Sequence, residues 1–142
     1  MGPCGGGGGD ANWMDMDGVN RVVRVAVRHG NAVDAIAVVY ERDGGEELTG
    51  LWGGQGGKRT EFRLQPDEYL TSVEGHYGTF KGKLVIRSLK FISNLHTYGP
   101  YGKEHGVPFE LPASPGGKIL GFHARYGVFL DAIGTYVKMA DQ

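Results

Sequence analysis

The sequence has a single cysteine and lacks the marks of an exported glycoprotein. Cys4 stands alone among 142 residues, which excludes an intrachain disulfide. No Asn-x-Ser/Thr sequon occurs, and the start of the chain has no apolar segment like that of a signal peptide. We therefore expect a cytoplasmic protein, and the domain could have been cut from a longer chain.

Long apolar runs and an excess of one charge are absent too. No stretch of about 18 apolar residues is present, which argues against a membrane span. The 15 Lys and Arg residues nearly balance the 16 Asp and Glu residues, and no basic stripe suits a nucleic-acid backbone. We expect one domain over residues 1–142, with neither membrane nor nucleic acid as its partner.

Residue sets typical of catalytic or cofactor sites are also missing. Glycines 5–9 are not followed by the Gly-Lys-Ser/Thr of a phosphate loop. A glycosidase needs two carboxylates about 5–9 Å apart across one bond. Asp131 is the candidate ligand-binding carboxylate of this chain, and the sequence places no second carboxylate near it. None of the five histidines shows a metal-ligand spacing; they are His29, His76, His96, His105 and His123. We predict no metal, no cofactor and no enzymatic activity.

Short strands account for most of the apolar pattern. In residues 23–27, 36–40 and 62–64, side chains on one face are apolar at every second position, and Ile133, Thr135 and Val137 likewise share one face. This is the period of a β-strand. No window supports a long amphipathic helix. The chain is therefore predicted to be all-β.

Glycine is abundant, and its placement indicates an internal repeat. The chain has 26 glycines among 142 residues, against a usual share of about 7%. Clusters at 5–9, 53–57 and 99–102 begin at similar intervals, and a Gly-x-x-x-Asp pattern occurs at 30–34 and 127–131. Residues 82–86 fall between these two, with Ile86 in place of Asp. Three copies of a unit of roughly 46 residues predict a β-prism of three four-stranded sheets with pseudo-threefold symmetry.

The Gly-x-x-x-Asp loop has the groups that a neutral polyol needs. Gly127 permits a sharp turn that leaves the amides of Val128 and Phe129 pointing outward, and Asp131 places a carboxylate beside these donors. Sugar hydroxyls both donate and accept, so they could bond to both kinds of group at once. One isolated Asp of this kind is more often a turn-capping residue. The recurrence of the loop, together with the glycine clusters, favours a binding site.

Four stretches resemble the signature of jacalin-related lectins. They are residues 2–6, 98–102, 107–112 and 121–134, and the resemblance extends from Gly2 to Tyr136. It implies a β-prism fold and reversible carbohydrate binding, without catalysis or a required metal. It points to the mannose-specific type found in plants, and so to a role in plant defence.

The resemblance also implies which residues contact the sugar. In the primary site these are Asp131 and the amides of Val128 and Phe129, after Gly127, with the Gly9 amide as a further contact. Some members carry a second site, and its pattern matches Asn31, Ala32 and Asp34, with Gly57 supplying the glycine-loop amide. The loop with Ile86 is not expected to bind sugar.

The sugar preference and the partners follow from the same resemblance. Galactose-preferring members are cleaved to expose a glycine amino terminus, whereas here the glycine loop is continuous with the first strand, which favours mannose- or glucose-containing glycans and glycoproteins. Tyr126, His76 and Tyr77 could stack on further sugars or be ordinary strand and turn aromatics. A homodimer or higher oligomer, or two sites, would supply avidity. A galactose-preferring lectin and a protein-interaction module with weak or lost sugar binding remain alternatives.

Overall fold

The computed structural model describes residues 1–113 and 115–139, and every regular element within them is a strand. The strands are β1 (Cys4–Gly5), β2 (Asp10–Trp13), β3 (Val19–His29), β4 (Val33–Arg42), β5 (Gly45–Leu48), β6 (Trp52–Gly53), β7 (Lys58–Arg63), β8 (Leu70–Phe80), β9 (Lys83–Ser93), β10 (Thr97–Gly102), β11 (Val107–Pro112), β12 (Lys118–Tyr126) and β13 (Leu130–Lys138). This part of the chain has no helix that could cross a membrane. The all-β prediction is confirmed.

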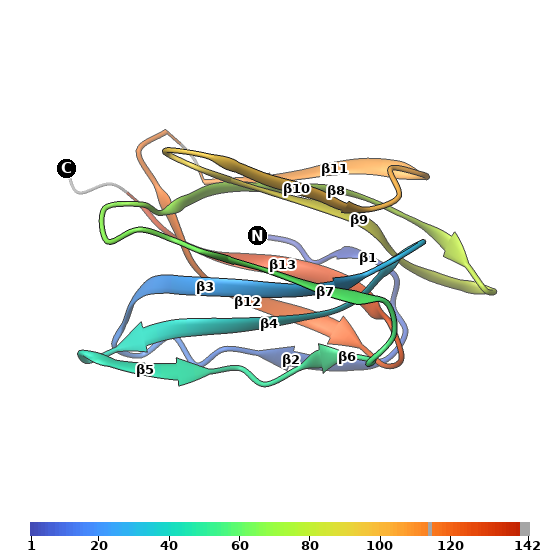
Figure 1. The fold of residues 1–142 in the computed structure, drawn as a ribbon, viewed down its shortest axis with the longest axis horizontal. Coiled ribbons are helices and arrows are strands. Elements are labelled where there is room, and N and C mark those ends of the chain that lie inside the picture. The colour runs from blue at the N-terminus through green and yellow to red at the C-terminus, as the bar shows by residue number, and fades with distance from the viewer. Residues whose placement is uncertain (114, 140–142) are drawn as a thin grey trace.

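Three groups of strands enclose one core (Figure 1). In the first group the order is β1-β13-β12-β2, and in the second it is β10-β9-β8-β11. A single residue pair, Ile119 with Leu70, joins these two groups into one hydrogen-bonded sheet of eight strands. The third group is a separate five-stranded sheet in which β6 and β5 pair with β4, β4 with β3, and β3 with β7. The β-prism prediction is confirmed, and the third group carries β5 as an additional strand.

Strand register gives the three groups their threefold relation. Each of the short strands β1, β6 and β10 pairs with the second long strand of its own hairpin, and does so at equivalent positions. The equivalent pairs are Cys4 with Ile133, Trp52 with Ile36, and Tyr101 with Leu89. The repeat expected from the glycine clusters is therefore a repeat of strand pairing.

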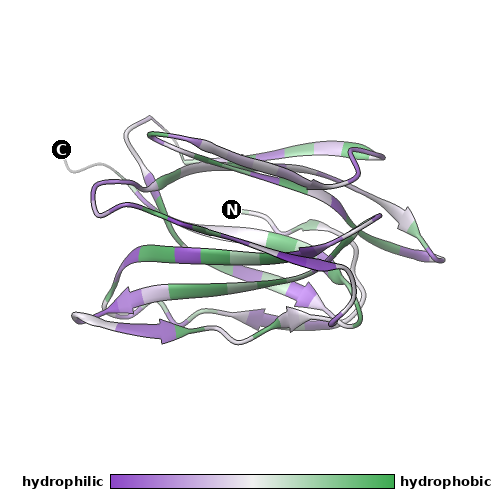
Figure 2. Ribbon diagram, in the orientation of Figure 1, coloured by the Kyte–Doolittle hydropathy of each residue, from purple (hydrophilic) through white to green (hydrophobic). Residues whose placement is uncertain are grey.

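The prism axis is filled by apolar side chains from all three groups. Ile36, Leu89 and Ile133, which hold equivalent positions, are each 0% exposed. Phe91 and Phe122 meet edge to face with their ring centroids 6.3 Å apart. Figure 2 shows hydrophobic residues spaced along the long strands, as expected when branched and aromatic side chains alternate on a half-buried sheet. This shared core fixes the three hairpins relative to one another.

One turn, between β7 and β8, is held by a buried carboxylate. Glu68 is 3% exposed and accepts hydrogen bonds from Ser93 Oγ at 2.5 Å and from Tyr98 OH at 2.7 Å. Burial alone would raise the pKa of Glu68, but its hydrogen bonds outweigh burial and lower the pKa to about 2. Its charge therefore stabilises the fold above the usual carboxyl pKa, and this contribution is lost as the pH falls toward 2.

Candidate functional site

The two Gly-x-x-x-Asp loops are hairpin turns with glycine loops beside them. Residues 30–32 connect β3 to β4, and residues 127–129 connect β12 to β13. The glycine loops 54–57 and 6–9 connect β6 to β7 and β1 to β2. These turns lie at the same end of the prism, on the right in Figure 1.

The turn between β12 and β13 leaves two backbone amides without a partner. The amide of Gly127 donates to the carbonyl of Phe129 at 3.0 Å and closes the turn. In the described part of the chain, the amides of Val128 and Phe129 donate to no other group. Asp131 follows in β13, is 5% exposed, and its carboxylate accepts no hydrogen bond from the described residues. The turn therefore offers donors and an acceptor to a ligand.

The glycine loop 6–9 lies directly against this carboxylate. The amide of Gly6 donates to the carbonyl of Asp131 at 2.8 Å. A Cβ built on Gly8 would lie 2.9 Å from Oδ2 of Asp131, and one on Gly9 would lie 2.8 Å from it. Gly9 also has a φ of +68°, where side chains other than glycine are strained. Only glycine lets the backbone of this loop approach the carboxylate.

An arginine fixes the orientation of that loop. Arg125 donates from Nε to the carbonyl of Gly8 at 3.1 Å and from Nη2 to the carbonyl of Gly9 at 2.9 Å. Burial raises the pKa of Asp131, and the positive charges of Lys83 and Arg125 partly oppose the rise. The arginine thus orders the loop and helps to keep the carboxylate ionised.

The turn between β3 and β4 repeats this arrangement bond for bond. The amide of Gly30 donates to the carbonyl of Ala32 at 2.9 Å, and the amide of Gly54 donates to the carbonyl of Asp34 at 3.0 Å. Arg28 Nε donates to the carbonyl of Gly56 at 3.1 Å. Burial raises the pKa of Asp34, and Arg28 is the largest opposing influence. The second loop is therefore built like the first.

Gly57 is equivalent to Gly9: its backbone lies against the carboxylate of the second loop. Its φ is +70°, and a Cβ built on it would lie 2.7 Å from Oδ2 of Asp34. In the described residues, the amides of Asn31 and Ala32 donate to no other group. The four residues predicted for a second site are thus brought together.

The second loop opens into a cavity of about 560 Å³. It is lined by Gly30, Asn31, Ala32, Asp34, Gly54, Gln55, Gly56, Gly57, Phe80, Lys81, Val128 and Phe129. The wall of Phe80 and Phe129, whose rings meet edge to face at 5.5 Å, comes from the other two strand groups. Sequence reasoning missed Gln55, Phe80 and Lys81, because repeat spacing does not say which turns become neighbours.

The third repeat corrects the predicted alignment. The amide of Lys103 donates to the carbonyl of Arg87 at 2.9 Å, which is the bond that Gly6 makes to Asp131. Arg87, and not Ile86, therefore occupies the carboxylate position. All three hairpins shift register at this position, but the β8–β9 hairpin alone continues beyond it, until Phe80 pairs with Lys83. Because of this extension, the sequence pattern aligns Ile86, one residue before Arg87, with Asp34 and Asp131.

The third glycine cluster is predicted at 99–102, but these residues do not form a loop like 5–9 or 53–57. The loop equivalent to 5–9 and 53–57 is 102–106, and it contains Lys103, Glu104 and His105 where the others have Gly or Gln. Gly102 corresponds to Gly5 in its approach to the neighbouring strand. The third repeat thus lacks both the carboxylate and the bare glycine backbone.

Of the aromatic residues expected to flank the sites, Tyr126 directly precedes the turn at 127–129, and His76 and Tyr77 lie on β8. Tyr126 stacks against Trp52 with ring centroids 6.5 Å apart. His76 Nδ1 lies 2.9 Å from Ser88 Oγ and lines a separate hollow, and Tyr77 packs near Phe109. None of the three lines the cavity at the second loop.

Free amides beside an unpaired carboxylate define a class of binding domain for neutral polyhydroxyl ligands. No group of three or more His, Cys, Asp or Glu within the described ranges could hold a metal ion. The model of the jacalin-like lectin domain matches residues 1–136. The chain therefore belongs to the jacalin-like lectin family, and so to carbohydrate-binding proteins rather than enzymes.

Relatives and solved structures agree with this family. Jacalin-related lectin 19 from Arabidopsis thaliana is 43% identical over 96% of this chain and 78% of its own length. A mannose/glucose-specific lectin from Parkia pendula is 40% identical over 97% of this chain, which spans 31% of that relative. The chain spans 23% of jacalin-related lectin 3 from Arabidopsis thaliana. The structure of AcmJRL, a mannose-binding jacalin-related lectin from Ananas comosus, superposes with a TM-score of 0.89 at 40% identity, covering 99% of this chain and 96% of that one.

Proposed function

We propose that this domain binds mannose- and glucose-type glycans at two places, the turn at Asp131 and the turn at Asp34. The observation that carries the proposal is the repeated set of free amides beside a free carboxylate, with the same bracing bonds in both loops. The sugar class is taken from relatives described as mannose-binding or mannose/glucose-specific. Each carboxylate accepts from two hydroxyls, and each glycine loop adds a donor.

The primary contacts are tested by replacing the carboxylate with its amide isostere. Asp131→Asn keeps the shape of the side chain but removes an anionic acceptor, and hydrogen bonds to charged groups contribute about 1.5–3 kcal/mol each. We expect titration calorimetry with methyl α-mannoside to show a single remaining site, and Asp34→Asn to remove that site in the double variant. A folded double variant that binds as the wild type does would reject both assignments.

A glycan array resolves the sugar class. The proposal expects signals on mannose- and glucose-terminated glycans that methyl α-mannoside competes away. Signals confined to galactose-terminated glycans would favour a galactose-preferring lectin. A blank array would favour a protein-interaction module.

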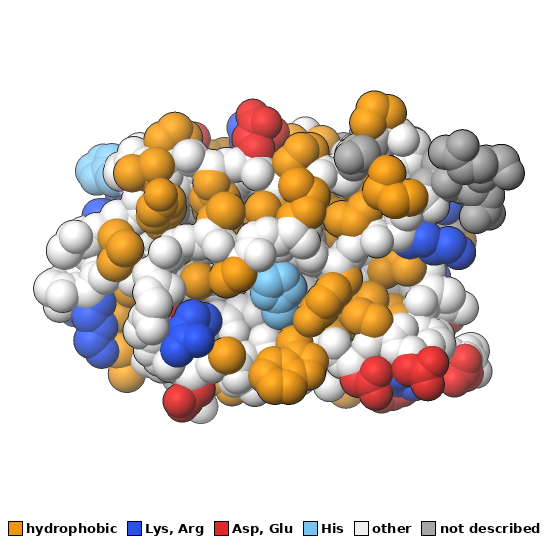
Figure 3. Space-filling model, turned by 180° about the vertical axis from the view of Figure 1, so that it is seen from behind, with side chains coloured by type: hydrophobic (Ala, Val, Ile, Leu, Met, Phe, Trp, Pro, Cys, Tyr) orange, Lys and Arg blue, Asp and Glu red, His pale blue; other side chains and the backbone are white. Residues whose placement is uncertain are grey.

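We also propose that the domain forms a homodimer, which would raise avidity through two copies of each site. Trp13 is 67% exposed on β2, at the edge of the first strand group. Trp13 lines a hollow of about 270 Å³ with Pro3, His123 and Tyr136, and Figure 3 shows one face on which apolar side chains gather. Sedimentation equilibrium is expected to give twice the chain mass for wild type and the chain mass for Trp13→Glu.

A further inference from the structure

A second hollow lies next to the cavity at Asp34. It has a volume of about 480 Å³ and is lined by His29, Gly30, Asn31, Lys58, Pro100, Gly102 and Lys103. Gly30 and Asn31 line both hollows. A ligand held at Asp34 could therefore extend across Asn31 into the neighbouring space.

The hollow exists because the third glycine loop carries a side chain where the other two carry none. Gly6 and Gly54 approach the turn of the neighbouring repeat so closely that a Cβ on either would collide with a backbone carbonyl, that of Leu84 or Val128. Lys103 holds the equivalent position, since its amide makes the equivalent bond to Arg87. Because Lys103 has a side chain, the β3–β4 turn at Gly30 and Asn31 cannot approach it as closely as the other turns approach Gly6 and Gly54. A space is left beside Lys103.

Only positive side chains are charged in the lining of this hollow. Lys58 begins β7, paired with His29, and Lys103 is held by backbone bonds at both its amide and its carbonyl. Neither ammonium group forms an ion pair with a carboxylate among the residues that the structure describes. Two lysines without carboxylate partners face a space connected to a sugar-binding turn.

The other titratable groups nearby do not cancel this charge. Burial and the charge of Lys58 lower the pKa of His29, whose Nε2 lies 2.9 Å from Thr60 Oγ1, and outweigh the opposing charge of Asp34, so the ring is neutral at pH 7. Glu104, next to Lys103, lines a different hollow together with Glu74. Asp34 lines the cavity on the far side of the turn.

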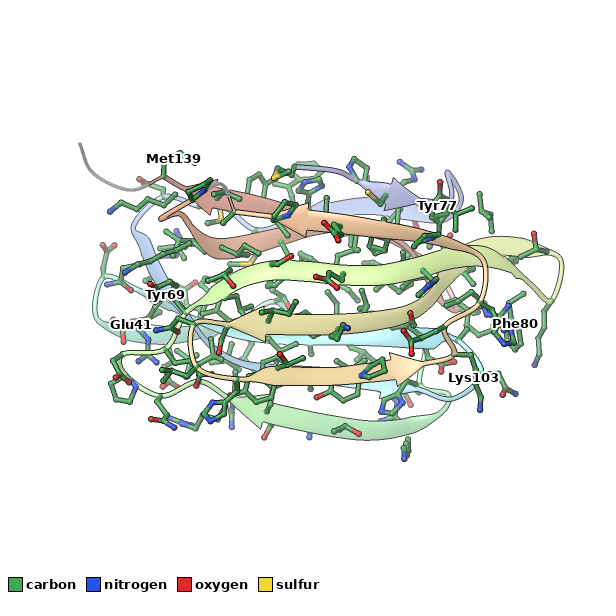
Figure 4. All side chains as sticks on the ribbon, turned by 90° about the horizontal axis from the view of Figure 1, so that it is seen from above. Glu41, Tyr69, Tyr77, Phe80, Lys103 and Met139 are labelled. Atoms are coloured by element: carbon green, nitrogen blue, oxygen red, sulfur yellow. The ribbon has the colours of Figure 1, made fainter. Side chains whose placement is uncertain are left out.

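The acidic residues of the β4–β5 hairpin lie at the opposite end of the prism. Figure 4 shows Glu41 at one end and Phe80 and Lys103 at the other. Glu46 and Glu47 belong to β5, which pairs with that same end of β4. The near-neutral chain thus keeps an acidic segment away from the lysines of the hollow.

We propose that the hollow between Lys58 and Lys103 receives an acidic substituent, a sulfate ester or a uronate carboxylate, of an oligosaccharide whose neutral hexose lies at Asp34. The proposal rests on the function proposed for the second loop. Lysine binds such groups as a mobile point charge and needs no fixed geometry, which suits a substituent that varies in position. The second site would therefore prefer acidic glycans over their neutral counterparts, and the primary site would not.

The test isolates the second site by using Asp131→Asn as the background. Titration calorimetry compares a neutral dimannoside with a panel of the same disaccharide bearing one sulfate, moved around the second ring, and with a glucuronate-containing disaccharide. We expect the best acidic ligand to bind roughly fivefold more tightly, because two exposed ion pairs each contribute modestly. We expect that preference to fall when sodium chloride is raised, since exposed pairs are screened.

A double variant locates the preference. Lys58→Gln with Lys103→Gln should abolish the preference for the acidic ligand and leave neutral binding unchanged. The matched control is Lys118→Gln with Lys138→Gln, an adjacent pair on β12 and β13, which should change neither value.

The possible outcomes distinguish the acidic subsite from the second sugar site. Equal binding of neutral and acidic ligands, or a preference that survives the Lys58 and Lys103 changes, overturns the inference and leaves the second sugar site standing. Binding of neither ligand overturns both. Acidic ligand bound through the two lysines without any neutral binding supports the acidic subsite and rejects the neutral contact at Asp34.

Discussion

The turn at Asp34 and its counterpart at Arg87 belong to hairpins that pair in equivalent ways, yet only the turn at Asp34 carries the groups proposed to bind sugar. Ile36 and Leu89, two residues further along each strand, are both fully buried, so the core holds the two hairpins in the same register. Their turns nevertheless differ: one closes at 30–32, and the other extends to 81–82. The prism conserves strand pairing and leaves the chemistry of its turns free to diverge.

The strongest test of the difference between the two proposed binding loops and the third loop is to add a side chain to the glycine loop of a proposed site. Gly9→Ala adds a Cβ that meets Oδ2 of Asp131 at 2.8 Å and the carbonyl of Tyr126, at a φ of +68°. We expect at least a tenfold loss of affinity at the primary site, or about 1.4 kcal/mol, measured by calorimetry with Asp34→Asn as the background.

The matched control for that change lies in the same loop. A Cβ built on Gly7 would meet nothing within 4 Å. Gly7→Ala should therefore bind methyl α-mannoside as the parent does. Equal losses in both variants would show that loop flexibility, and not the space beside Asp131, matters for binding.

A smaller effect is expected when the arginine brace is removed. Arg125→Gln deletes two bonds to the carbonyls of Gly8 and Gly9, so the loop must be ordered by the ligand instead. We expect about a fivefold weaker primary site, in keeping with exposed bonds of about 0.5–1.5 kcal/mol. Arg28→Gln should weaken the second site alone, and Arg59→Gln, whose partner is Glu61, should weaken neither.

Lower pH should weaken binding before it weakens the fold. Burial raises the pKa of Asp131, and a protonated carboxyl loses an acceptor for sugar hydroxyls, so affinity falls as the pH drops through this raised value. Glu68, with a pKa lowered to about 2, keeps its stabilising charge in that range. We expect the affinity measured by calorimetry to fall as the pH is lowered from 7 toward the raised pKa, with an unchanged near-ultraviolet circular dichroism spectrum. A spectrum that changes in parallel with affinity would assign the loss to unfolding.

The sequence was informative wherever one copy could be compared with another. The recurrence of Asp34 and Asp131 after glycine identified both carboxylates, and alternating apolar residues identified the strands. The same comparison contains an arginine two residues before each of these glycines, Arg28 and Arg125, and this repeat marks the residues that hold the glycine loops.

What could not be predicted depends on three-dimensional neighbours. Whether Phe80 or Lys103 borders the second loop depends on how the three turns pack around the axis, which no spacing encodes. The misplacement of Ile86 has a similar origin. The register shift at Arg87 also occurs at Asp34 and Asp131, but only the β8–β9 hairpin continues beyond it, to the Phe80–Lys83 pair, and so places one more residue between the glycine and the shift.

The smallest effect is expected from Arg87→Asp, which tests why the third repeat is not expected to bind sugar. Arg87→Asp restores a carboxylate at the equivalent position, but the loop facing it still contains Lys103 and His105, and the turn at Lys81 and Gly82 offers no counterpart to the 127–129 loop. Because Arg87 Nε donates to the carbonyl of Asn31 at 3.1 Å, the change is made in an Asp34→Asn background, where we expect the calorimetric stoichiometry for methyl α-mannoside to stay at the parental value. A gain of one site would mean that the carboxylate alone makes a site, and that the glycine backbone is dispensable. No gain would show that a carboxylate at this position is not sufficient for sugar binding.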